Sequence, residues 1–257
     1  MDKNGNKVGL GLDVSTQTIG VSLIIDDGSE YGKIFELTHI KPKVSSKVEG
    51  IEQLFLKNKI FKEFLVKYKD FGIDFVVIEE PLLKSNNVNT VSTLLRFNGM
   101  ISDSVYNVLG IVPEYISSHD ARKYAFPDLM AVRKYDKKEN QYPSKKIEKG
   151  IKEANLVLFG SYPWTIDKKT VLQQKVSDIF PQIEWLYNKK GELKKENFDG
   201  VDAYVAVLGY INKHKYGDLE FSSEIIGESN DGNGTKEIIY NIKYWDKTEE
   251  RRTYIKE

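Results

Sequence analysis

The fold of this chain is decided by the stretch Val8-Gly-Leu-Gly-Leu-Asp-Val-Ser15. This stretch continues to Ile25 as Thr-Gln-Thr-Ile-Gly-Val-Ser-Leu-Ile-Ile. The first run predicts a strand over Val8–Asp13, and the apolar run Gly20–Ile25 predicts a second strand. Asp-Asp-Gly at 26–28 is a turn signal, and Tyr31–Ile40 alternates as a third strand does. Three strands joined by short turns predict an antiparallel meander.

The next segments extend this meander into an α/β pattern. Apolar residues fall at helical spacing over Val48–Tyr68 and again over Val88–Leu109. Between these helices, Phe75–Ile78 is fully apolar, as in the middle of a sheet, and Val112–Ser117 predicts a fifth strand. The order β-β-β-α-β-α-β predicts an α/β fold in which helices flank a mixed five-stranded sheet.

One residue inside the second helix is unusual for a helix. Gly99 costs about 1 kcal/mol relative to alanine at such a position, so we expect it to pack closely against a neighbouring element. Further helices are predicted over Lys169–Phe180 and Asp202–Ile211, and residues 144–159 could form another.

The remaining segments predict additions to this core. The stretch 133–175 holds eleven basic and five acidic residues, with tyrosine and tryptophan interspersed. We therefore expect one core domain over residues 1–216 with a basic insertion at 126–168, which is either a DNA-facing element or a solvated loop. Residues 217–257 alternate around a Ser-Asn-Asp-Gly-Asn-Gly turn, and they predict a C-terminal β-hairpin extension that ends in a basic strand.

Composition restricts the chemistry and the cellular setting. The 257 residues include 38 basic and 38 acidic side chains, so bulk charge gives no argument for nucleic acid. There are no cysteines and three histidines, which excludes thiolate zinc sites and disfavours histidine-rich ones. No signal peptide or membrane span is recognisable, so a cytoplasmic protein without a membrane partner is expected. Lysine-, isoleucine- and asparagine-rich usage suits a low-GC bacterium or its phage.

Carboxylates from three distant segments carry the functional argument. Asp13 and Glu79 lie in apolar runs that predict buried strands, where a bare carboxylate is costly. Asp199 and Asp202 are spaced to share one face of a helix that we expect them to open. If the first and fourth strands are neighbours, all four acids converge. Such a cluster predicts Mg²⁺, for which Mn²⁺ is expected to substitute, and two ions could support phosphodiester cleavage.

Each acid also has a simpler interpretation. Asp13 could form a turn or a salt bridge, and Glu79, beside Glu80, could be an ordinary strand end. Asp199 could be a helix N-cap and Asp202 a first-turn acid favoured by the helix dipole. The order of all three motifs together favours the metal site.

These motifs resemble those of the ribonuclease-H-like superfamily, specifically the RuvC-type Holliday junction resolvases. The resemblance rests on Gly11-Leu-Asp-Val-Ser-Thr-Gln-Thr-Ile-Gly20, on Val77-Ile-Glu79 with the helix and strand after it, and on Asp199-Gly-Val-Asp202-Ala203. It covers most of residues 7–125 and 169–214. The three acidic motifs in this order are moderately specific, and none is specific alone.

The resemblance implies a magnesium-dependent endonuclease that works as a homodimer and resolves four-way DNA junctions, an activity of DNA recombination and repair. It implies that Asp13, Glu79, Asp199 and Asp202 are the catalytic metal ligands. By position, Arg122 and Lys175 match residues that contact phosphate in that family.

The chain departs from the family pattern after the second acid. Where these enzymes can carry an aromatic wedge against the junction, this chain has Glu80-Pro-Leu82-Leu83. Leu82 and Leu83 could serve as an apolar wedge in contact with DNA, but they cannot stack on bases.

Other functions compete with junction resolution. A related nuclease could act on other branched DNA or on RNA. Gly-x-Asp-x-Ser also resembles the phosphate-binding turn of actin-like and sugar-kinase-like phosphotransferases, although 257 residues hardly accommodate their paired domains and no second Asp-Gly-Gly-rich turn is present. A catalytically inactive binding module is the third class, and retention of every acid argues against it.

Overall fold

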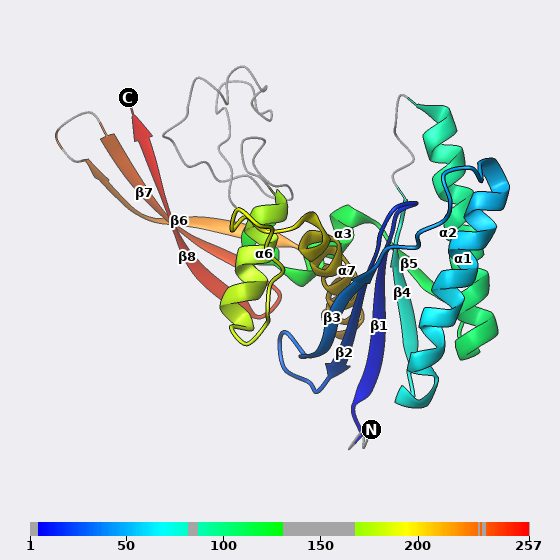
Figure 1. The fold of residues 1–257 in the computed structure, drawn as a ribbon. Coiled ribbons are helices and arrows are strands. Elements are labelled where there is room, and N and C mark those ends of the chain that lie inside the picture. Colours follow the sequence, from blue (N-terminus) through cyan, green and yellow to red (C-terminus); the bar gives the residue numbers. More distant parts are fainter. Residues whose placement is uncertain (1–4, 82–86, 131–167, 231, 233–234, 257) are drawn as a thin grey trace.

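The computed structural model describes residues 5–81, 87–130, 168–230, 232 and 235–256 (Figure 1). The core elements, in chain order, are β1 (Lys7–Val14), β2 (Ile19–Asp26), β3 (Lys33–Ile40), α1 (Gly50–Leu65), the 3₁₀ helix η1 (Val66–Phe71), β4 (Phe75–Glu79), α2 (Val88–Leu109), β5 (Glu114–Ile116), α3 (Ser118–Ala125), α4 (Pro127–Met130), α6 (Lys168–Ile179) and α7 (Lys195–Tyr216). A second group of strands follows: β6 (Phe221–Asn230), β7 (Thr235–Tyr244) and β8 (Lys247–Lys256).

The first five strands form one mixed sheet in the order β3-β2-β1-β4-β5. β2 pairs antiparallel with both β1 and β3, which confirms the meander. β4 pairs parallel with β1 on one side and with β5 on the other. The predicted α/β fold with a mixed five-stranded sheet flanked by helices is therefore confirmed.

Helices cover both faces of this sheet and enclose two separate apolar clusters (Figure 1). Strand residues alternate between faces, so Val8, Leu10 and Leu12 of β1 join α1 and α2 in one cluster. Residues of α3, α6 and α7 form the other cluster, which includes Val77 of β4. Asp13 and Glu79 lie on the second face, since they alternate with Gly11 and Val77.

Helix α7 lies unusually close to the sheet because glycines line its path. A Cβ atom on Gly11 would lie 2.1 Å from the carbonyl oxygen of Ala203, and one on Gly20 would lie 1.9 Å from the carbonyl oxygen of Asp199. Neither distance is compatible with a side chain, so only glycine permits this backbone-to-backbone approach.

Several predicted boundaries differ from the observed ones. The helix predicted over Val48–Tyr68 ends at Leu65 and continues as η1. Gly99 does not pack closely, since a Cβ there would meet nothing within 4 Å, and that prediction is wrong. Helix α3 was not predicted. The helix suggested for residues 144–159, within the basic insertion, lies outside the described residues.

The start of α7 corrects the simpler interpretation of its acids. The helix begins at Lys195 with Lys194 at the N-cap position, so Asp199 and Asp202 lie in its second turn and beyond. Asp199 is therefore not an N-cap, Asp202 is not a first-turn acid, and the two do not open the helix. The lysines and glutamate of this first turn gave no apolar periodicity from which to place its beginning.

The C-terminal segment forms three antiparallel strands, β6-β7-β8, so the predicted hairpin is extended by the basic last strand. It packs against the core through a small cluster of Tyr124, Leu219, Ile242 and Tyr244. Trp245 stacks on Tyr124 of α3 at a ring-centroid distance of 6.4 Å. Among the helices that the structure describes, each is too short or too polar to cross a lipid bilayer.

The glycine-lined contact predicts a large difference between two glycine-to-alanine substitutions. Gly20→Ala should lower the free energy of unfolding by about 3 kcal/mol or more, because its methyl group overlaps the α7 backbone. Gly99→Ala should raise it by about 0.5–1 kcal/mol, because alanine is the better helix former and the space is open. Urea denaturation of both variants measures this, and equal effects would contradict the proposed packing.

Candidate functional site

Asp13 and Glu79 reach the same end of the sheet on the same face. Asp13 alternates with Gly9 and Gly11, whose missing side chains make room for α7. On β4, Glu79 alternates with Val77, which belongs to the α7-side cluster. The parallel register pairs Gly11 with Val77, and it places Asp13 and Glu79 together at the carboxyl ends of neighbouring strands.

Helix α7 brings the other two acids to this point. The carbonyl oxygen of Asp199 lies against Gly20, the residue that pairs with Asp13 across β1 and β2. Asp202 follows three residues later and is only 4% exposed. Asp13, Glu79 and Asp199 are partly buried. The predicted convergence of four carboxylates on one end of the sheet therefore has a structural basis in the α7 contact.

Burial raises the pKa values of three of these acids. Burial raises the pKa of Asp13 well above its ordinary value, and the carboxylates of Glu79, Asp202 and Asp199 add to the effect. Burial, with a contribution from Asp202, raises the pKa of Glu79 to about 7. Burial also raises the pKa of Asp199. In the absence of a cation, the site therefore resists carrying its full negative charge.

Two basic side chains approach the most buried acid. Lys169 Nζ at the start of α6 lies 3.1 Å from Asp202 Oδ2, and Arg122 Nη2 of α3 lies 3.8 Å from Asp202 Oδ1. The charge of Lys169 partly opposes the rise in the pKa of Asp13, and that of Arg122 partly opposes the rise in the pKa of Glu79. Arg122 was selected from the sequence, whereas Lys169 was missed. It stands in a run of lysines, and nothing in the sequence marks it as the one that faces the acids.

The other predicted DNA-binding residues lie elsewhere or outside the described residues. Lys175 Nζ forms an ion pair with Asp128 Oδ2 at 2.9 Å, so its phosphate contact stays a prediction that requires this pair to open. Leu82 and Leu83 lie in the segment 82–86, which the structure does not describe.

The turn after Asp13 is closed by a hydroxyl group. Ser15 Oγ accepts a hydrogen bond from the amide of Thr18 at 3.0 Å and donates one to the Thr18 carbonyl at 2.8 Å. These bonds hold the tight connection between β1 and β2. The Ser15 hydroxyl is therefore engaged within its own turn.

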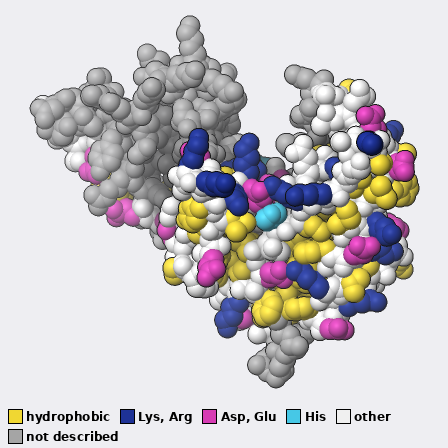
Figure 2. Space-filling model, viewed as in Figure 1, with side chains coloured by type: hydrophobic (Ala, Val, Ile, Leu, Met, Phe, Trp, Pro, Cys, Tyr) yellow, Lys and Arg dark blue, Asp and Glu magenta, His cyan; other side chains and the backbone are white. Residues whose placement is uncertain are grey.

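A histidine borders the carboxylates on the β3 side. His39 pairs with Gly20 across the sheet, and burial lowers its pKa while Glu196 and Asp199 oppose this. Glu196 itself forms an ion pair with Lys41. Figure 2 shows one view of the molecular surface, on which acidic and basic side chains gather around a histidine.

The donor set fits a hard divalent cation. Within the described ranges, no hydrogen bond or ion pair holds the carboxylates of Asp13, Glu79 or Asp199, and such unpartnered buried charges are costly. All four donors are oxygens, which Mg²⁺ and Mn²⁺ prefer. Among the same residues no three acids stand at ligand distance, so binding of a cation here would require the carboxylates to move closer together.

Comparison with solved structures supports this architecture. Thermus thermophilus RuvC in complex with a Holliday junction substrate matches 82% of this chain and 96% of its own, with a TM-score of 0.50 and 11% identity. The chain has the ribonuclease-H-like fold. A second structure of Thermus thermophilus RuvC matches the same shares at a TM-score of 0.45 and 14% identity. An Aquifex aeolicus PPX-GPPA enzyme reaches 0.33 at 10% identity, over 68% of this chain and 64% of its own.

Sequence comparison adds no family assignment. No family model matches the chain, and no curated protein sequence matches it. The similarity to RuvC therefore concerns the fold alone.

The raised pKa of Glu79 predicts an unusual pH dependence of stability. Because the folded chain binds this proton more tightly than the unfolded chain, Glu79 stabilises the fold below its ordinary pKa of 4.5, and this contribution is lost as the pH rises towards about 7. Without divalent cations, the wild-type chain should therefore lose roughly 1–3 kcal/mol between pH about 4.5 and 7.5 relative to Glu79→Gln.

Urea denaturation of both proteins across this pH range in a chelating buffer measures the difference. Adding Mg²⁺ at pH about 7.5 should restore stability to the wild type more than to Glu79→Gln, because the cation favours ionised ligands. Parallel stability curves for the two proteins would show that Glu79 does not titrate in this range.

Proposed function

We propose that this protein is a magnesium-dependent, structure-selective DNA endonuclease that resolves four-way junctions by paired phosphodiester cleavage. The observation that carries the proposal is the Asp13 carboxylate, which is unpartnered among the described residues and lies beside three further acids on a ribonuclease-H-like sheet. A buried carboxylate of this kind is costly to the fold, and a functional cation explains its retention.

Asp13, Glu79, Asp199 and Asp202 would hold the cations in this proposal. Two bound Mg²⁺ ions would supply an activated water and would stabilise the leaving oxygen of the cleaved phosphodiester. The protein's part is to hold the four carboxylates at one point, from strands β1 and β4 and from helix α7. The close contact of α7 with Gly11 and Gly20 fixes the backbone that carries Asp199 and Asp202, and the carboxylates would close around the cations on binding.

Lys169 and Arg122 would act on the substrate side of the same site. Both now contact Asp202, and cation binding would compete for that carboxylate. The two side chains could then contact the phosphate that is cleaved, where positive charge stabilises the transition state. Lys169 is 49% exposed and Arg122 is 19% exposed, so the lysine has the greater freedom to turn towards DNA.

The substrate is argued from the fold and from local charge. Thermus thermophilus RuvC, the similar structure, was solved with a Holliday junction. In this chain the basic insertion at 126–168 would contact the junction backbone, Leu82 and Leu83 would press against its base pairs, and a homodimer would cut two symmetry-related strands. We assign residues 1–216 to the nuclease core and 217–257 to an extension. A related nuclease on flaps, forks or RNA is the alternative.

Substitution of single acids tests the catalytic assignment. Asp13→Asn and Asp202→Asn should each reduce cleavage of a labelled four-way junction in Mg²⁺ by about 10³-fold or more, because each removes a metal ligand. Binding of the junction in a gel shift should persist. Asp120→Asn is the matched control, since Asp120 is a partly exposed helix acid that pairs with Lys213.

Circular dichroism should show that both acid variants remain folded, and the melting temperature of Asp13→Asn without cations should rise as repulsion is removed. Cleavage at wild-type rate by either variant would contradict the metal-site assignment. Flap, duplex, single-strand and RNA–DNA substrates in the same assay distinguish junction resolution from the alternatives.

Two lysine variants test which lysine acts in cleavage. Lys169→Gln should slow single-turnover cleavage by about 10²-fold, because its ammonium group lies at the acids. Lys175→Gln should alter cleavage by less than about fivefold, because Asp128 holds this lysine outside the acid cluster. The reverse order of effects would show that Lys175 contacts the cleaved phosphate.

A further inference from the structure

The connection between α6 and α7 forms a short hairpin, residues 186–195, which the proposed metal chemistry does not use. The Lys194 amide donates a hydrogen bond to the Leu186 carbonyl at 2.9 Å, and the Asn188 amide donates one to the Glu192 carbonyl at 2.9 Å. Lys194 is also the N-cap residue of α7. The base of this α6–α7 hairpin therefore adjoins the helix that carries two of the four acids.

Two asparagine side chains hold the α6–α7 hairpin in place. Asn188 Oδ1 accepts hydrogen bonds from the amides of Lys190 and Glu192 at 2.8 and 3.1 Å, which closes the turn. Asn197 of α7 is only 7% exposed. It accepts a hydrogen bond from the Leu186 amide at 3.0 Å and donates one to the Leu186 carbonyl at 2.7 Å. Because both backbone groups of one residue are bound to a buried side chain, the hairpin is fixed to α7 before any ligand binds.

The α6–α7 hairpin carries an excess of positive charge. Its ten residues include four lysines and one glutamate, and Asn188 Nδ2 donates a hydrogen bond to this Glu192 at 2.8 Å. The lysines are Lys189, Lys190, Lys194 and Lys195. All four are exposed, and within the described part of the chain none of them forms an ion pair. Like charges gathered on a fixed element repel one another, and an anionic partner relieves this repulsion.

Exposed apolar side chains accompany these lysines. Tyr187 is 54% exposed and Leu186 is 43% exposed, although both belong to an ordered element. Tyr187 forms an antiparallel bridge with Leu193 across the hairpin, so the two side chains are neighbours on one face. A duplex backbone would need the lysines alone. An exposed ring beside cations suits unpaired nucleotides, because a base can stack on the ring while phosphates meet the ammonium groups.

The α6–α7 hairpin also lies close to the acid cluster. Lys194 precedes Asp199 by five residues, which corresponds to about 7.5 Å along a helix axis. Burial lowers the pKa of His39 on β3, an effect that Asp199 opposes and Lys194 assists, so both charges act on the same imidazole. A strand bound at the hairpin would therefore lead to the acids.

We propose that the α6–α7 hairpin binds unpaired nucleotides of a DNA strand beside the acid cluster, with a base on Tyr187 and phosphates at the lysines. This inference rests on the proposed nuclease function, because that function supplies DNA as the ligand. Nucleotides that are already unpaired, as at a branch, cost less to bind in this way than nucleotides within a duplex.

Binding of a labelled oligodeoxythymidylate in a chelating buffer tests the stacking contact. Tyr187→Ser should weaken binding by at least about fivefold, because one base loses its stacking partner. Tyr187→Phe keeps the ring and should bind as the wild type does. Tyr106→Ser is the matched control, since Tyr106 is 56% exposed but lies on α2, over the other face of the sheet. These exposed positions should tolerate substitution without loss of the fold.

The salt dependence of the same binding tests the phosphate contacts. Combining Lys189→Gln with Lys190→Gln should lower the slope of log affinity against log salt by about 1.4, because each phosphate contact on a single strand contributes about 0.7. Lys59→Gln combined with Lys62→Gln removes the same charge from exposed positions on α1 and should leave the slope unchanged.

A strand that carries 5-iodouracil identifies the residue in contact. Irradiation of the complex should link the base to Tyr187, as mapped by mass spectrometry of the digested protein. Affinity for a duplex of the same length should be equal in Tyr187→Ser and the wild type. A loss of duplex affinity as large as the loss of single-strand affinity would overturn the preference for unpaired nucleotides.

Failure of this inference can be distinguished from failure of the proposed function, because binding is measured without cleavage. If the chain cuts junctions in Mg²⁺ but the tyrosine and double-lysine variants bind single strands as the wild type does, the hairpin contact is overturned and the nuclease function stands. If these variants bind more weakly but the chain cuts no DNA, the hairpin contact is supported and the nuclease function is overturned.

Discussion

The backbone contact between α7 and the sheet is the constraint on which the rest of the structure depends. Gly11 and Gly20 let the Ala203 and Asp199 carbonyls approach the strands more closely than any side chain would permit. The helix is thereby held at one depth and one rotation about its axis. That rotation presents Asp199 and Asp202 to Asp13, so the same glycines that admit the helix also determine where its acids lie.

Electrostatic repulsion opposes the gathering of acids that this packing imposes. Burial raises the pKa of Asp13 and of Glu79, and the neighbouring carboxylates add to the effect. Lys169 and Arg122 compensate part of the charge on Asp202, the most buried of the four. In the cation-free state Asp202 is therefore paired with basic side chains, whereas the other three carboxylates have no such partner among the described residues.

Much of the fold could be predicted from the sequence, because strands β1, β2 and β4 are long apolar runs with few alternatives. Asp13 and Glu79 were found because a carboxylate within such a run is conspicuous.

The start of α7 was missed, since its first turn is charged and gives no apolar period. Lys169 was missed for a different reason: facing Asp202 is a property of the packed structure, and one lysine in a basic run resembles the next. The prediction for Gly99 was wrong because a glycine can occur within a helix for several reasons. Only the structure shows that the space around it is open.

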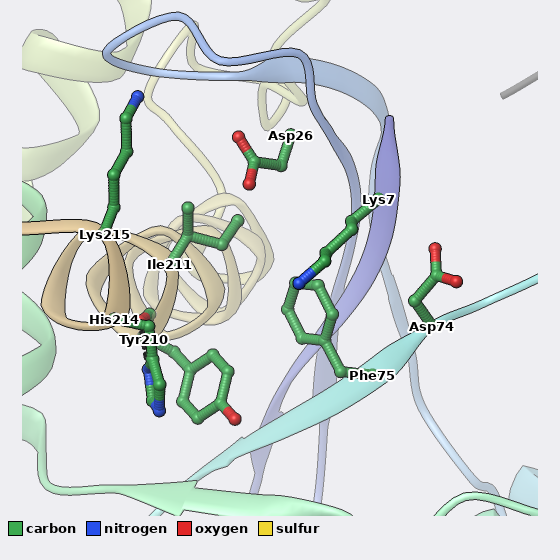
Figure 3. Close-up of a pocket in the computed structure, with 8 residues that line it drawn as sticks. All are labelled: Lys7, Asp26, Asp74, Phe75, Tyr210, Ile211, His214 and Lys215. Atoms are coloured by element: carbon green, nitrogen blue, oxygen red, sulfur yellow. Dashed lines mark hydrogen bonds between the residues drawn. The ribbon is translucent and has the colours of Figure 1, made fainter. Parts of the chain in front are cut away.

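A cavity of about 380 Å³ at the opposite end of the sheet from the acids (Figure 3) illustrates a similar limit. Its residues come from β1, the end of β2, the start of β4 and the last turns of α7, and none forms a recognisable motif. Phe75 and Tyr210 each read as ordinary core positions in sequence. Their stacking becomes evident only once the helix is placed against the strands.

The dependence of the first strands on α7 has a consequence for how the chain folds during synthesis. Asp13 and Asp199 are 186 positions apart, and ribosomes add about 5–20 residues per second, so β1 and β2 precede their covering helix by roughly 10–40 s. In that interval α1 and α2 can cover one face of the nascent sheet, while the glycine-lined face stays exposed. Completion of the native core is thus a late event of high contact order, and the newly made N-terminal half is the part of this protein most in need of chaperone protection.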